Sequence, residues 1–220
     1  MTDPSTVYDR LRTQILELER LPGSRVTERG LEAELGASRT PLRAALQRLE
    51  AEGLIAHEGR GWQVSPIDLG EIGRLSELRD ALETAAVRHT CARAGDDAIT
   101  AIARTLDTQQ SAHGHDAAVR AGEDFHVRLA ALSGNHFFAD AVQSAMTRLA
   151  RTRWLEVRTE ETRRAAWEEH RAIVELVGRR DADAAAERIH AHIVATHDRL
   201  LAALDADARG LRARGLAIVR

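Results

Sequence analysis

The stretch ELGASRTPLRAALQRLEAEGLI, residues 34–55, is the most informative part of the sequence for the first third of the chain. Three leucines in it recur at the spacing of one helix face: Leu42, Leu46 and Leu49. Gly36 is a typical stop for the helix before it, and Ser38 is a typical N-cap for the helix after it. Pro41 then falls in a first helical turn, where proline is tolerated. The stretch therefore predicts the end of one short helix, a tight turn and a second helix.

The residues on either side of this stretch complete a small domain. A helix is expected upstream, because four apolar residues recur at helical spacing: Val7, Leu11, Ile15 and Leu18. The segment Leu21–Gly23 ends that helix, and Thr27 caps the short helix that follows. Downstream, residues 54–57 and 62–65 are short extended runs around a glycine turn. The order helix, helix, tight turn, helix and β-hairpin predicts a winged helix-turn-helix over residues 1–66.

The third helix of this domain is the element expected to read double-stranded DNA. Its N-terminus offers free backbone N–H groups and the positive end of the helix dipole, which suit a phosphate. Arg39 and Arg43 are four residues apart and share one helix face, and an arginine fork matches the acceptors of guanine in the major groove. Further DNA contacts are expected near the helix starts and at the hairpin tip, from Arg29, Ser38, Thr40, Arg60 and Gly61. An isolated arginine pair is more often a solvated face, but the order of the elements favours DNA binding.

The rest of the chain is predicted to be a helical bundle. After Pro66 there is no proline, and Ala, Leu, Arg and Glu dominate. Glycines and polar residues divide this part into six expected helices, at residues 68–94, 96–112, 115–132, 136–157, 161–179 and 182–206. We therefore expect a mainly α protein, in which an antiparallel all-α bundle of about six helices spans residues 67–206. An arginine-rich tail is expected at residues 207–220.

Composition and charge exclude several classes of protein. The single cysteine, Cys91, rules out an internal disulfide and a cysteine-based zinc finger. No apolar run approaches the roughly 20 residues of a membrane span, and the N-terminus does not resemble a signal peptide. We therefore expect a soluble cytoplasmic protein with no membrane partner. The net charge of −3 leaves nucleic-acid binding open, because affinity depends on the local patch.

Three histidines lie inside the expected amphipathic helices of the bundle: His126, His170 and His192. Histidines that converge between the helices of a bundle are natural ligands of a divalent metal such as zinc. A single histidine of this kind is more often a core residue with one hydrogen-bond partner. The prediction of a metal site therefore depends on all three side chains meeting.

Several motifs resemble one known family. The 34–55 stretch, together with LPGSRVTE at residues 21–28, resembles the winged helix-turn-helix of GntR-family transcription regulators over residues 6–66. The segments LRDALETAA, DFHVRLAALSGN and EEHRAIVELVGRRDADAAAERIHAHI resemble the effector domain of the FadR subfamily, called FCD. The resemblance implies a ligand-responsive DNA-binding regulator and not an enzyme. It also implies a homodimer that binds a short palindromic operator, and repression is the commoner outcome in this family.

The FCD resemblance implies a metal site and its ligands. Many members bind a divalent metal, which here would be zinc or nickel, through an Asp, a His four residues later, and two His on the last two helices. His126, His170 and His192 match the three histidines. Gly122 stands where the family has Asp. Either Glu123, which lies on nearly the same helix face, or a water or effector carboxylate would then complete the site.

The same resemblance implies a small carboxylate as the effector. Arg79 matches a position that often helps to hold such a ligand, and a guanidinium fork suits a carboxylate. The alternative for Arg79 is a surface ion pair with Glu83, four residues later. Asn135 is a weaker candidate for the same effector, and its alternative is a helix cap.

Two other functions remain open from the sequence. The first is a DNA-binding regulator whose helical domain only dimerises and binds no metal, which Gly122 favours. The second, more remote, is a metal-dependent helical-bundle enzyme. The chain has no HExxH and no paired Glu-x-x-His motif, and an enzyme would leave the winged domain without a role. A sensor domain should gain thermal stability from its metal or effector, and a bare dimerisation domain should not.

Overall fold

The computed structural model describes residues 4–59, 61–110, 125–153, 155, 157 and 159–219. The chain divides into two compact units, one made of Met1–Leu69 with Ala206–Arg220 and one made of Gly70–Asp205. As predicted, the fold is mainly helical with a small antiparallel sheet near the N-terminus. No helix among these residues is long and apolar enough to cross a bilayer.

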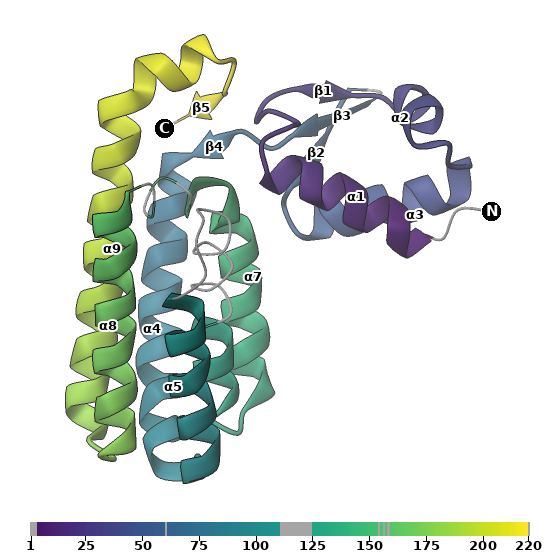
Figure 1. Ribbon diagram of the computed structural model, residues 1–220. Helices are drawn as coiled ribbons and strands as arrows, with labels where there is room; N and C mark the ends of the chain where they lie inside the picture. Colours follow the sequence, from purple (N-terminus) through teal and green to yellow (C-terminus); the bar gives the residue numbers. More distant parts are fainter. Residues whose placement is uncertain are drawn as a thin grey trace. The chain divides into compact units, whose positions relative to one another are not determined.

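The first unit contains a winged helix-turn-helix (Figure 1). Its helices are α1 (Pro4–Leu16), α2 (Glu28–Leu35) and α3 (Arg39–Ala51). Its antiparallel sheet has the order β1-β3-β2, with β1 at Arg25–Val26, β2 at Ile55–Glu58 and β3 at Gly61–Val64. The hairpin of β2 and β3 is predicted from the sequence, but β1 is not. This strand is two residues long and is defined by its pairing with Trp62 and Gln63 of β3.

Local sequence explains how the helix-turn-helix is built. Thr27 caps α2 as predicted, because its hydroxyl accepts a hydrogen bond from the Gly30 N–H at 3.2 Å. Gly36 ends α2 in the left-handed conformation, with φ of 62°, which glycine adopts without a steric penalty. Ser38 stands at the N-cap of α3, but its side chain makes no capping hydrogen bond. The buried faces of the three helices meet Trp62 and Val64 in one apolar core.

The C-terminal residues complete the first unit and do not form the separate tail expected at 207–220. The helix α9 (Ala182–Ala213) runs beyond the predicted end at residue 206, and the strand β5 (Ile218–Val219) follows it. This strand pairs in parallel with β4 (Ile67–Asp68).

Backbone hydrogen bonds and apolar burial explain why this segment is ordered. The Ala217 N–H donates to the Pro22 carbonyl at 3.0 Å, and the Ile67 N–H donates to the Ala217 carbonyl at 2.9 Å. Leu211 and Leu216 are buried. The segment therefore satisfies its backbone groups and buries two leucines within the first unit.

The second unit is a helical bundle, and its long helices lie side by side in Figure 1. They are α4 (Leu69–Arg93), α5 (Asp96–Gln110), α7 (His136–Arg153), α8 (Glu160–Gly178) and the larger part of α9. Residues 125–131 form a further helical segment. A shared apolar core joins α4, α5, α8, α9 and this segment, and the Trp167 indole N–H donates to the Leu106 carbonyl at 3.1 Å between α8 and α5.

Two predicted helices of this unit differ from the structure. The helix expected at 136–157 spans His136–Arg153. Thr159 caps the start of α8 through a capping box with Thr162. Most of the helix expected at 115–132 lies outside the described residues. The remaining helices begin and end within a few residues of the predicted bounds, apart from the longer α9.

Candidate functional site

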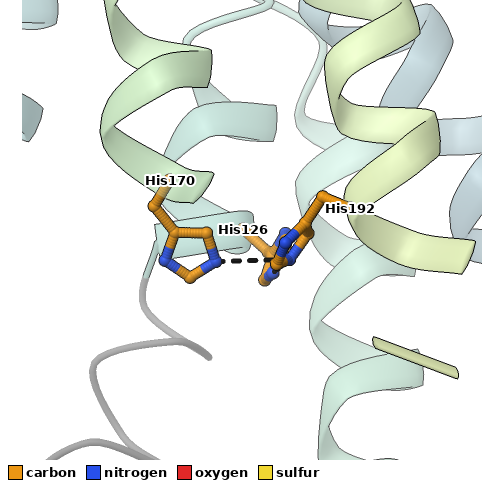
Figure 2. Close-up of side chains that lie close together, drawn as sticks. All are labelled: His126, His170 and His192. Carbon is orange, nitrogen blue, oxygen red and sulfur yellow. Dashed lines mark hydrogen bonds between the residues drawn. The ribbon is translucent and has the colours of Figure 1, made fainter. Parts of the chain in front are cut away.

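Three buried histidines converge in the second unit (Figure 2). His126 comes from the helical segment 125–131, His170 from α8 and His192 from α9, and none is more than 5% exposed. The Nε2 atom of His192 lies 3.3 Å from Nε2 of His170 and 3.3 Å from Nε2 of His126. The ring nitrogens that the three side chains offer all lie within 4.8 Å of one another. The three histidines singled out from the sequence are therefore in contact.

The Nδ1 atom of His126 forms a hydrogen bond with a buried ion pair on α4. His126 Nδ1 lies 2.6 Å from Oε2 of Glu83. The other oxygen of Glu83 accepts a hydrogen bond from Nε of Arg79 at 2.7 Å. One carboxylate therefore serves both a histidine of the cluster and the arginine predicted to hold the effector.

The Nδ1 atom of His192 forms a corresponding hydrogen bond with a second ion pair. His192 Nδ1 lies 2.6 Å from Oε2 of Glu169 on α8. Arg199, on α9, donates to both oxygens of Glu169, at 3.0 and 3.1 Å. His170 is held differently, because its ring stacks on Phe125 with 4.0 Å between the ring centroids.

Both carboxylates are ionised at neutral pH. Burial raises the pKa of Glu83, but the positive charge of Arg79 and the contact with His126 outweigh burial and hold it well below its ordinary range. Burial also raises the pKa of Glu169, but the hydrogen bonds from His192 and its arginine lower it to about 2. An ionised carboxylate only accepts hydrogen bonds, which assigns the ring proton of His126 and His192 to Nδ1. The Nε2 lone pairs of these two rings then face each other, as they would around a shared cation.

The imidazoles themselves are neutral. Burial lowers the pKa of His126 to about 3 and also lowers the pKa values of His170 and His192. The positive charge of Arg79 acts in the same direction on all three rings. A neutral imidazole is the form that ligates a metal. Three neutral, buried nitrogen donors that converge on one point fit zinc or nickel.

Arg79 makes the ion pair with Glu83 that the sequence offers as an alternative, but the pair is buried. The two side chains are 4% and 1% exposed, so this is not a surface salt bridge. The Nη2 atom of Arg79 is also buried, and it has no hydrogen-bond partner among the described residues. A buried donor without an acceptor costs about 1–3 kcal/mol. This atom is therefore suited to bind an oxygen of an added ligand.

The carboxylates that hold the histidines were not singled out from the sequence for this role. A signal existed for Glu83, since Ala86 and Val87 follow it at three and four residues and place a charged residue on an apolar helix face. Glu169 directly precedes His170 and gives no comparable signal. Its contact with His192 joins two helices at a separation of 23 residues, which local periodicity does not reveal.

The sequence also offers two weaker candidates for this site, Glu123 and Asn135. Glu123 lies outside the described residues, so the predicted replacement for the family Asp stays a prediction. The Asn135 side-chain oxygen accepts a hydrogen bond from the Phe137 N–H at 3.1 Å, at the start of α7. This bond is the one expected of a helix cap, and the predicted effector contact of Asn135 stays a prediction.

The predicted DNA-reading arginines lie on the exposed face of α3. The side chains of Arg39 and Arg43 are 77% and 62% exposed. Each is paired with an acidic residue of α2, since Arg39 Nε lies 3.1 Å from Glu32 and Arg43 Nε lies 3.0 Å from Glu28. Exposed pairs of this kind contribute about 0–1 kcal/mol, so DNA can compete for both guanidinium groups.

The other predicted DNA contacts surround these arginines in sequence. Arg29, at the start of α2, is exposed, as are Ser38 and Thr40 at the start of α3. The Ser38 hydroxyl makes no capping bond and can donate to a phosphate. Gly61 pairs with Glu58 at the turn of the hairpin. Arg60 lies outside the described residues.

Comparison with known proteins defines the class to which this fold and site belong. Residues 4–64 match the bacterial regulatory proteins of the gntR family, and residues 74–195 match the FCD domain. The FCD match covers more than half of the chain. The chain belongs to the GntR family of regulators that carry an FCD domain. It is a DNA-binding transcriptional regulator and not an enzyme, because its families and relatives are transcriptional regulators.

Individual relatives agree with this assignment. The Nta operon transcriptional regulator of Aminobacter aminovorans is 36% identical over 184 residues, which are 82% of this chain and 86% of that protein. The HTH-type transcriptional repressor NanR of Escherichia coli K12 is 28% identical over 204 residues, which are 83% of this chain and 76% of NanR. The solved structure of E. coli McbR/YncC has the same fold, with a TM-score of 0.74 at 16% identity over 91% of this chain and 98% of that one.

Proposed function

We propose that this chain is a repressor of the FadR subfamily that binds DNA as a homodimer and is controlled by a small carboxylate effector at a metal centre. The observation that carries the proposal is the meeting of three buried, neutral imidazoles close to a buried arginine, one donor of which has no partner among the residues described. His126, His170 and His192 would hold a divalent metal, zinc or nickel. Arg79 would bind the carboxylate of the effector.

The donor set supports the metal. Nitrogen ligands suit zinc and nickel better than the hard cations calcium and magnesium. Metal-ligating histidines usually donate their other ring N–H to a carboxylate, and His126 and His192 are both placed to do this. When bound, the metal supplies a Lewis-acidic centre for an anionic oxygen. With Gly122 in place of the family Asp, either Glu123 or that oxygen would complete the set of ligands begun by the three histidines.

The chemistry of Arg79 supports a carboxylate as the effector. A guanidinium fork binds carboxylates through two parallel hydrogen bonds, and the Nη2 atom of Arg79 has no hydrogen-bond partner within the described part of the chain. The positive charges of the metal and of Arg79 both favour an anion. A carboxylate that contacted both the metal and Arg79 would neutralise buried positive charge. The effector would therefore bind more tightly to the conformation of the protein in which the metal and Arg79 lie together.

The winged domain supports operator binding by a homodimer. A single module buries too little surface for tight and specific binding, and a two-fold dimer on a palindrome doubles the contacts. Arg39 and Arg43 would read bases, and Arg29, Ser38 and Thr40 would contact the DNA backbone. The wing that carries Arg60 and Gly61 would reach toward the minor groove. NanR, a relative, is described as a repressor, which supports repression here. A regulator that binds a DNA operator acts where that DNA is, so we propose a cytoplasmic location.

Elemental analysis of the purified protein, followed by thermal melting with and without EDTA, tests the metal. We expect about one zinc or nickel per chain and a lower Tm after chelation, because a ligand that binds only the folded state stabilises it. His192→Ala should carry no metal. His190→Ala is the matched control, since His190 lies on the same helix but is exposed and paired with Asp80.

Effector binding is tested next, by melting the metal-loaded protein with a panel of small carboxylates. A rise in Tm that depends on the metal would support the effector proposal. A wild type that contains no metal, takes none up and melts like His192→Ala would refute the metal centre. The helical domain would then serve dimerisation, and the search for an effector would turn to metal-free anions at Arg79.

A further inference from the structure

The two carboxylates behind the histidine cluster have the same local arrangement on different helices. Glu83 accepts from His126 with one oxygen and from Arg79 with the other. Glu169 accepts from His192 and, with both oxygens, from Arg199. In each case a histidine, a carboxylate and an arginine form a chain that ends at an Nε2 atom of the cluster. Two independent chains of this kind converge on one point.

Such a chain controls both the tautomer and the direction of the imidazole. The carboxylate keeps the proton on Nδ1, so that the lone pair is on Nε2. The 2.6 Å contacts also fix the ring plane, because the ring cannot rotate without losing a charge-assisted hydrogen bond. The arginine in turn fixes the carboxylate. Without these contacts, a buried neutral imidazole would exchange between two tautomers, and one of them points an N–H at the metal position.

The burial of these groups argues against a purely stabilising role. Removing charges from water costs several kcal/mol per ion, and apolar residues of similar volume are often as stable as a buried ion pair. Glu83 is 2% exposed and Arg79 is 3% exposed. A pair at that depth is better explained by what it does for the histidine at its end.

We propose that Glu83 and Glu169 are positioning residues of the metal centre, which set the ligand tautomers of His126 and His192 and aim their Nε2 atoms at the metal. This inference rests on the proposed metal-binding function. Glu83 has a second role, because it also orients the effector-binding arginine. The two carboxylates therefore differ in a testable way: Glu83 acts on metal and anion, and Glu169 acts on the metal alone.

Cobalt(II) titration of the metal-free full-length protein tests the positioning role, with the ligand-field absorption bands as the signal. We expect Glu169→Ala to lose about 10- to 100-fold in Co²⁺ affinity, the range typical for partners of metal ligands. Glu169→Gln keeps an acceptor for Nδ1–H but lacks the charge, and should fall between Glu169→Ala and the wild type. Glu175→Ala is the matched control, since Glu175 is an exposed residue of the same helix.

Nitrogen-15 NMR of the imidazoles in the metal-free protein reports the tautomer of each histidine. This tautomer would not change if the two carboxylates only stabilised the fold. In the wild type, His126 and His192 should carry their proton on Nδ1. In Glu169→Ala, His192 should lose this preference while His126 keeps it. This measurement does not require bound metal, and it therefore separates the positioning role from the metal-binding function.

Glu83→Gln tests the double role. We expect it to lower Co²⁺ affinity about 10- to 100-fold and also to remove the rise in Tm given by carboxylates, whereas Glu169→Gln retains that rise at saturating Co²⁺. If Glu83→Gln does not fold, the Glu169 variants decide the positioning role, because Glu169 is partly exposed and its loss is better tolerated.

Three results would overturn the inference. The first is a Glu169→Ala protein that binds Co²⁺ within twofold of the wild type. The second is a wild type in which His126 and His192 carry their proton on Nε2. The third is a wild type that binds no Co²⁺ at all, which would also remove the proposed function, since there would be no metal centre to position. The first two results leave that function standing.

Discussion

Arg43→Ala is the substitution that tests most directly how α3 contacts DNA. Arg43 is 62% exposed, and in the DNA-free protein its Nε lies 3.0 Å from Glu28 on α2. A bidentate contact from an arginine to guanine contributes about 1–3 kcal/mol of discrimination. We therefore expect Arg43→Ala to weaken binding to the operator by about 1–3 kcal/mol, which is roughly 5- to 150-fold in Kd.

The pairing of Arg43 with Glu28 adds a second, opposite expectation. To contact a base, Arg43 must leave this carboxylate, and an exposed pair contributes about 0–1 kcal/mol to the free protein. Glu28→Gln should therefore tighten operator binding by up to about 1 kcal/mol. In a protein that already carries Arg43→Ala, there is no Arg43–Glu28 ion pair to break. Glu28→Gln should then lose the part of its effect on operator affinity that comes from releasing Arg43. The double-mutant cycle thus separates release of Arg43 from a general loss of negative charge near DNA.

Fluorescence anisotropy with an operator obtained by in vitro selection gives the measurement. The same titration is repeated at a second salt concentration and with single-base variants of the operator, because phosphate contacts change the salt dependence and base contacts do not. Glu50→Ala is the control on the same helix, since Glu50 is exposed and lies two turns from Arg43. Its operator affinity should stay close to that of the wild type.

Either of two outcomes would refute the reasoning. If Arg43→Ala weakens operator and unrelated DNA equally and lowers the salt dependence, Arg43 contacts phosphate and does not read a base. If Arg43→Ala changes the affinity neither for the operator nor for unrelated DNA, α3 is not the recognition helix of this domain.

Three further predictions concern metal, stability and the effector. If the protein is the proposed metal-binding homodimer, His170→Ala should lose the metal in elemental analysis and keep the dimer in sedimentation velocity, because the side chain is buried within one bundle; loss of the dimer would contradict this. Tyr8→Phe should destabilise the winged domain by about 1 kcal/mol in urea unfolding, since the Tyr8 hydroxyl donates to Glu52. Burial, with the nearby carboxylate, raises the pKa of Tyr8 from 10.0 to about 12. The wild type should therefore lose stability as pH rises from 10 toward 12, and Tyr8→Phe should lose less; parallel curves would refute the link. Arg79→Lys keeps a cation beside Glu83 but lacks the fork, so it should bind metal and fail to respond to carboxylates in melting experiments; a wild-type response would remove Arg79 from the effector site.

The sequence predicts the winged domain well because its signals are local. Thr27 and Gly36 mark the bounds of α2 through the conformations that their residue types prefer, and the leucines of α3 mark its buried face. The strand β1 could not be predicted in this way. It consists of Arg25 and Val26 and exists through pairing with β3, across more than 35 residues of chain.

The candidate site was only partly predictable for a similar reason. The three histidines stand out because polar residues on apolar helix faces are unusual. Their carboxylate partners come from α4 and α8, and the match depends on how these helices are rotated about their axes. Arg79 and Glu83 illustrate the limit: their spacing predicts an ion pair, but not that it lies buried against His126.

The pairing of β4 with β5 has a consequence for how the protein is made. The winged core uses residues 7–64 and can close while the ribosome is still translating the bundle. Ile218 and Val219, by contrast, are synthesised only after every helix of the second unit. The segment that leads from the winged domain into α4 therefore receives its partner strand last. Nascent chains that carry a closed winged core still lack this strand, and a fragment cut after Asp68 keeps β4 but never acquires its partner.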